Sequence, residues 1–179
     1  MSTPTTARGA LSRRVGTLLA AAALVAAPAV LTPSAAMAAS TDPTLVGAHY
    51  LQQQLAAGGH HFSVTYGEDV YPDHGVTADA VLALAAAGTA QDEAALATSW
   101  LEDYVVGYIG FGDPNEIYAG SLAKLLNVAL AQGLDPAAFG EDENAVPYDL
   151  VTMLKGREQT NGRFSDQSAY GDNSNTFGQ

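Results

Sequence analysis

Residues 78–87 read ADAVLALAAA, with Asp79 as the only polar residue, and Gly88 follows them. A helix that is apolar on every side offers no face suited to water, so we expect neighbouring elements to enclose it. Residues 117–132 have the same character, with Lys124 and Asn127 as exceptions. The two segments predict helices of an inner layer, the first starting near Thr77 and the second after an Asp113-Pro114 opening.

Three further segments predict amphipathic helices with one polar face, which suit an outer layer. The first opens with Asp42-Pro43, a cap residue followed by proline, and should run to about residue 57, where two glycines stop it. The second covers 89–106 and the third 147–158. No segment shows sustained strand alternation, and FSVTY at 62–66, the best candidate, is expected in a loop. The predicted class is all-α.

The segments recur with a period of about fifty residues, in units of about 44–88, 89–133 and 147–179. Tyr71, Asp73 and Thr77 of the first unit align with Tyr170, Asp172 and Thr176 of the third. A fixed period of this size indicates a stacked or circular array. Alternating outer and inner helices then predict a partial α/α toroid. Because its last inner helix is missing, the chain is interpreted as a truncated product or partial gene model.

Residues 1–39 predict a secretory signal peptide. A positive head at Arg8, Arg13 and Arg14 precedes an apolar run at 18–31, and a small-x-small cleavage pattern ends at Ala38. A membrane anchor fits less well, because the run is too short to span and contains Pro28. The expected mature domain, 40–179, has no predicted membrane span and is secreted or displayed at the cell surface.

Charge and cysteine content exclude several functions. After residue 39 the chain has nineteen Asp and Glu against four Lys and Arg, a net charge of −15. Such a surface repels nucleic acid phosphates and anionic lipid. The chain has no Cys, which rules out disulfides, thiol nucleophiles and thiolate metal sites.

Repeated motifs add a family resemblance. Gly58-Gly59 and Phe62, followed by Asp73-x-x-x-Thr77 and VLAL, recur in part as residues 162–165 with Asp172-x-x-x-Thr176. Over residues 44–179 this pattern resembles the repeat of the prenyltransferase β-subunit and squalene cyclase superfamily, and it implies an α/α toroid. The Asp-x-Asp-Asp acid of the cyclases is missing, and without Cys the zinc site of the prenyltransferases cannot form. The resemblance therefore implies neither the cyclase activity nor the prenyltransferase activity for this chain.

The loop 60–76 and the C-terminal stretch that aligns with it hold the candidate site residues. Histidines 60, 61 and 74 with Asp73 could bind zinc, but they also fit a solvated loop, which we favour. Asp73 and Asp172 could contact a ligand or Ca²⁺, or they could cap helix N-termini. Their neighbouring tyrosines could line a binding mouth or wedge loops against helices. The ligand-binding candidates are Tyr71, Asp73, His74, Tyr170 and Asp172.

No catalytic group, metal site or cofactor motif is identified in the chain. The sequence therefore favours an exported, non-catalytic toroid module that binds a small molecule or a surface polymer. The alternative is a terpene cyclase-like, prenyltransferase-like or polysaccharide-processing enzyme whose catalytic residues lie beyond residue 179. Fold resemblance alone cannot choose between them.

Overall fold

The first helix forms where Asp42-Pro43 predicts it. In the computed structural model, which describes residues 41–172, helix α1 spans Pro43–Ala57. The Asp42 carboxylate accepts the Thr44 N–H at 2.9 Å, and Pro43 occupies the first turn, where no backbone donor is needed. Gly58 ends the helix, as predicted.

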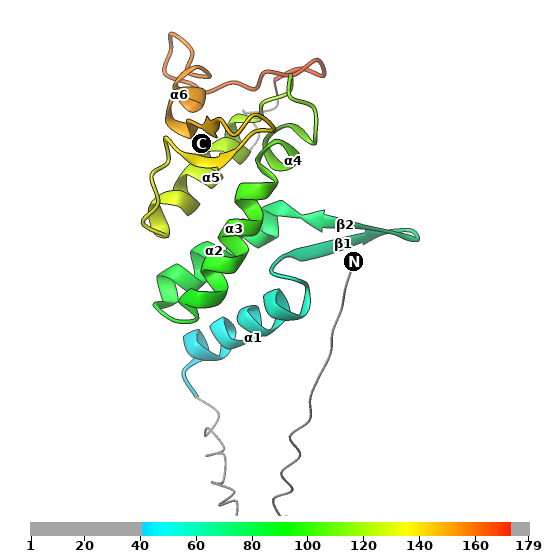
Figure 1. Ribbon diagram of the computed structural model, residues 1–179, viewed down its shortest axis with the longest axis vertical. Helices are drawn as coiled ribbons and strands as arrows, with labels where there is room; N and C mark the ends of the chain where they lie inside the picture. Colours follow the sequence, from blue (N-terminus) through cyan, green and yellow to red (C-terminus); the bar gives the residue numbers. More distant parts are fainter. Residues whose placement is uncertain (1–40, 173–179) are drawn as a thin grey trace, which may run out of the picture. The chain divides into compact units, whose positions relative to one another are not determined.

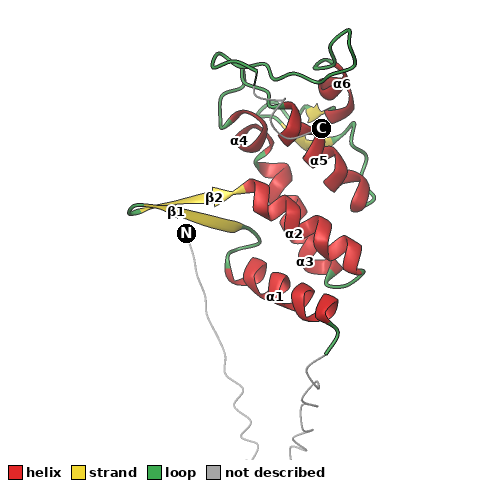
Figure 2. Cartoon of the chain, turned by 180° about the vertical axis from the view of Figure 1, so that it is seen from behind, coloured by secondary structure: helices red, strands yellow, loops and turns green. Residues whose placement is uncertain are grey.

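Strands β1 (Phe62–Tyr66) and β2 (Asp69–Asp73) form an antiparallel hairpin that extends away from the helices (Figures 1 and 2). Its two-residue turn places Gly67 at φ +65°, a conformation that glycine adopts without strain. Val64 of β1 lies opposite Tyr71 of β2. The hairpin is joined directly to helix α2 (His74–Ala87), which Asp73 caps by accepting the Val76 N–H at 2.9 Å.

Helix α2 is central to the core. It contacts α1, α3 (Gln91–Asp103), α4 (Val105–Gly110) and α5 (Ala119–Ala131). In Figure 1, α1 lies on one side of α2 and α3, and α5 with α6 (Leu150–Lys155) lies on the other. The largest fully buried side chains are Phe139, Leu55, Leu84, Leu101, Leu122, Leu125 and Leu150.

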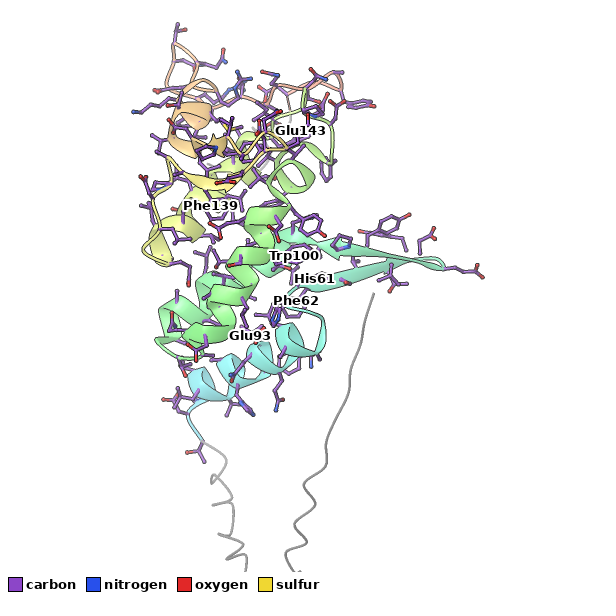
Figure 3. All side chains as sticks on the ribbon, in the orientation of Figure 1. His61, Phe62, Glu93, Trp100, Phe139 and Glu143 are labelled. Carbon is purple, nitrogen blue, oxygen red and sulfur yellow. The ribbon has the colours of Figure 1, made fainter. Side chains whose placement is uncertain are left out.

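A second small sheet joins α5 to α6. Strand β3 (Phe139–Glu141) pairs with β4 (Pro147–Tyr148) across an irregular register, and β3 packs against α3. Phe139, labelled in Figure 3, is fully buried at this contact. Within residues 41–172, none of the helices combines the length and the apolar character needed to cross a membrane.

The predicted all-α class is wrong. The described residues contain six helices and two antiparallel two-stranded sheets, so the protein is mixed α/β. The expected loop at 62–66 is strand β1, because Phe62 and Val64 alternate with Ser63 and Thr65 before a turn. The same alternation was too short in the sequence to distinguish from a loop.

The predicted toroid is also wrong. Its premise required all-apolar helices to be enclosed, yet α2 exposes Ala83 and Ala86, and α5 exposes Leu130 to 57%. Helix α1 likewise exposes Leu45 to 42%. Alanine has so little apolar area that leaving it in water costs little free energy. An Ala-rich segment therefore does not force enclosure.

Thr77 fastens the hairpin to α2, and its replacement should destabilise the fold. Its buried hydroxyl accepts the Phe62 N–H at 2.9 Å and donates to the Asp73 carbonyl at 2.7 Å. Thr77→Val keeps the shape but removes both hydrogen bonds, so we expect the free energy of unfolding to fall by about 1–3 kcal/mol. Urea denaturation would measure this loss.

Thr65→Val is the matched control, because Thr65 is exposed on β1. We expect it to change stability by no more than about 0.5 kcal/mol. Equal effects of the two substitutions would contradict the fastening role of Thr77.

Candidate functional site

A groove of about 680 Å³ lies between the hairpin and the α4 region. We call it the hairpin groove, and it is lined by Val64, Tyr66, Tyr71, Pro72, Asp73, His74, Gly75, Gly107, Tyr108, Phe111 and Gly112. Tyr66 is 69% exposed, Tyr71 50% and Phe111 81%. Exposed aromatic side chains gathered along a concave surface are typical of ligand-binding grooves.

Stacked rings support the base of this groove. His61 lies against Trp100, with ring centroids 4.4 Å apart and planes within 5° (Figure 3). Trp100 in turn contacts His74, whose ring stacks on Tyr108 at 5.8 Å. These contacts join the start of β1, the start of α2 and the α3–α4 segment. The groove walls are therefore positioned before any ligand binds.

The polar groups of the groove are largely uncharged at neutral pH. Burial lowers the pKa of the His74 imidazole, against the opposing effect of the Asp73 charge. Burial also raises the pKa of the Tyr108 phenol, so this side chain stays protonated. The Nε2 atom of His74 is buried and has no hydrogen-bond partner among the described residues. The groove thus offers a neutral imidazole and phenol groups beside one carboxylate.

Three of the five predicted ligand-binding residues come together here. Tyr71, Asp73 and His74 all line the hairpin groove. The helix-capping interpretation of Asp73 is confirmed by its bond to the Val76 N–H. Because Asp73 both caps α2 and lines the groove, the structural and ligand-contacting interpretations do not exclude each other.

The other two predicted residues lie elsewhere. Tyr170 is 85% exposed and, like Asp172, is not among the residues that line the hairpin groove. Asp172 pairs with Arg163 and accepts the Asp166 N–H at 3.1 Å. The helix expected to follow Asp172, including Thr176, falls outside the described residues.

The histidines of the 60–76 loop have separate partners. His60 Nδ1 lies 2.7 Å from Glu93 Oε1, whereas His61 and His74 join the stacked rings. Between residues 41 and 172, no group of three or more His, Asp or Glu side chains is placed to hold a metal ion. The solvated loop favoured from sequence does not describe His61 and His74, whose rings pack on Trp100 of α3 and Tyr108 of α4.

Sequence reasoning missed Val64, Tyr108 and Phe111 as residues of the groove. The signal for Val64 was the alternation of β1 followed by glycine. Phe111 follows α4 at φ +51°, and its ring and that of Tyr118 meet in an edge-to-face arrangement.

Comparison of the chain with protein-family models, curated proteins and solved structures finds no match. The resemblance to the prenyltransferase and squalene cyclase superfamily therefore stays a prediction. The α/α toroid that it implies is contradicted by the mixed α/β fold.

Proposed function

We propose that this protein is an exported, non-catalytic module that binds a neutral polysaccharide in the hairpin groove. The observation that carries the proposal is the set of three exposed aromatic side chains, Tyr66, Tyr71 and Phe111, along one open groove. Aromatic faces pack well against the C–H faces of sugar rings, and phenol hydroxyls at their edges can bond to sugar hydroxyls. Export rests on the signal pattern of residues 1–39, which are outside the described part of the chain.

Charge supports a neutral ligand. The chain after residue 39 carries a net charge of −15, so polymers rich in uronate or sulfate would be repelled. The low pKa of His74 removes the cation that could offset this repulsion in the groove. A groove that is open rather than enclosed also suits a polymer, which can enter along its length.

The test is binding to a panel of neutral polymers, such as cellulose, starch and chitin, followed by calorimetry with matching oligosaccharides. We expect saturable binding to at least one polymer and no release of new reducing ends. Tyr71→Ala should weaken this binding by about tenfold or more, because it removes one of the three exposed aromatic faces of the groove.

Tyr170→Ala is the matched control, since it makes the same deletion at an exposed tyrosine outside the groove. It should leave affinity within about twofold of the unchanged protein. Absence of binding to every neutral polymer, or equal affinity of the two variants, would contradict the proposal.

A further inference from the structure

Strand β1 forms an open edge of the hairpin, which projects from the helices (Figures 1 and 2). The Phe62 N–H is directed toward β2, since it donates to Thr77 Oγ1 beside the strand partner Asp73. Successive residues of a strand point their backbone groups to opposite sides, so the N–H and C=O groups of Ser63 and Thr65 face outward. Within residues 41–172 these outward groups have no hydrogen-bond partner, and both side chains are exposed. Such an edge can pair with another strand.

The opposite edge of the hairpin, on β2, is closed to further pairing. Pro72 lies opposite Ser63, so the same alternation turns its backbone nitrogen outward, and proline has no N–H to donate. Asp69 and Asp73 add negative charge to β2, whereas β1 contains no charged residue. Proline and charge are the features by which edge strands avoid association. The hairpin therefore has one edge that can accept a strand and one that cannot.

The sequence of β1 is suited to pairing with itself. It reads FSVTY, so an aromatic residue, a hydroxyl residue, valine, a hydroxyl residue and an aromatic residue follow one another. Antiparallel pairing of two copies about Val64 places like residues opposite each other: Val64 with Val64, Ser63 with Thr65, and Phe62 with Tyr66. Aromatic pairs and pairs of hydroxyl residues both stabilise antiparallel strands. A symmetric dimer requires this kind of self-complementary surface.

Charge favours β1 as the place where two copies can meet. The chain after residue 39 carries a net charge of −15, so most surfaces of one copy repel the same surfaces of another. The uncharged strand β1 brings no acidic residue opposite an acidic residue. Two copies can therefore pair here without the repulsion that acts elsewhere on the surface.

We propose that two copies of this protein form a dimer in which their β1 strands pair antiparallel about Val64. The outward backbone groups of Ser63 and Thr65 then bond to those of Thr65 and Ser63 in the other copy, and the two hairpins become one continuous sheet. Pro72 lies at both outer edges of this sheet, so the assembly closes at two copies. The proposal is independent of the ligand in the hairpin groove.

Sedimentation equilibrium of the purified protein, from micromolar to millimolar concentration, tests the dimer. We expect a monomer–dimer equilibrium without larger species. Thr65→Pro removes an outward N–H from β1 and should weaken the dimer by about tenfold or more, because each copy loses a backbone hydrogen bond to the other. Val70→Pro is the matched control, since Val70 lies opposite Thr65 and has its N–H on the closed edge. It should leave the dimer affinity within about twofold of the unchanged protein.

Cysteine cross-linking tests the register, even if a proline variant does not fold. The chain contains no Cys, so Val64→Cys introduces a single thiol. In the proposed pairing the two copies of residue 64 form a pair without mutual hydrogen bonds, with Cα atoms about 4.5 Å apart, which is within the range of a disulfide. Val70→Cys is the control, and Val70 is more available to random collision because it is 66% exposed.

Under mild oxidation we expect Val64→Cys to form a covalent dimer at least about tenfold faster than Val70→Cys, because the dimer holds its thiols together. A protein that stays monomeric at every concentration would overturn the proposal, even if the β1 edge then accepted an extended peptide of another protein. Equal dimer affinities of the two proline variants, equal cross-linking rates of the two cysteine variants, or assembly beyond the dimer would overturn it as well.

Discussion

Phe139→Ala should lower the free energy of unfolding by about 3–5 kcal/mol, the largest loss that we expect from a single core substitution. Phe139 is fully buried and belongs to the core cluster that the helices share. Its removal leaves a cavity between β3 and α3 that rigid neighbours cannot fill. Thermal denaturation should show a fall in Tm of at least about 10 °C.

Phe111→Ala provides the matched control, because the same side chain is removed at a position that is 81% exposed. Its stability should stay within about 0.5 kcal/mol of the unchanged protein. A loss for Phe139→Ala no greater than that for Phe111→Ala would show that the β3 contact is not part of the core.

Gly140→Ala should destabilise the protein by about 2–5 kcal/mol, through two separate causes. The first cause is backbone strain, because Gly140 has φ +61°, a conformation that residues with a Cβ rarely adopt. The second is a steric clash, because a Cβ there would lie 2.3 Å from the Glu102 carbonyl oxygen. Because that oxygen belongs to the backbone of α3, it cannot rotate away. Urea denaturation would measure the effect as a lower midpoint.

Gly133→Ala separates the two causes. Gly133 has φ +71°, but a Cβ there would meet no atom within 4 Å. Strain alone should cost about 1–2 kcal/mol at this position. If the two alanine variants are equally stable, then the close approach of β3 to α3 contributes nothing and the account of this contact is wrong.

Local signals in the sequence predicted the parts of the fold that local interactions determine. The Asp42-Pro43 opening of α1 and its end at Gly58 are confirmed, as is the end of α2 at Gly88, which is left-handed. Asp73 as a helix cap is confirmed for the same reason, since the bond joins residues only three apart. Caps and glycine stops act within one turn and are therefore visible in sequence.

Around α5, contacts between residues far apart in sequence made the prediction from local signals wrong. Asp113-Pro114 was predicted to open a helix, but the Asp113 carboxylate instead closes a turn on the Asn115 N–H at 2.8 Å. Helix α5 begins only at Ala119, whose N–H donates to the Asp166 carboxylate at 2.8 Å. A cap supplied from so far along the chain leaves no local pattern.

The sequence predicted only those residues of the candidate site that lie close together along the chain. Tyr71, Asp73 and His74 are close in sequence and share one wall of the hairpin groove, so a local pattern found them. The opposite wall, with Tyr108 and Phe111, depends on how α4 packs. Asp172, which aligns with Asp73 in the sequence repeat, does not line this groove.

The Asp166 contact has a consequence for biosynthesis. The ribosome adds residue 166 well after α5 has been translated, so a nascent chain that ends between them lacks the acceptor for the Ala119 N–H. The start of α5 and the segment that caps it must then be completed in one late step.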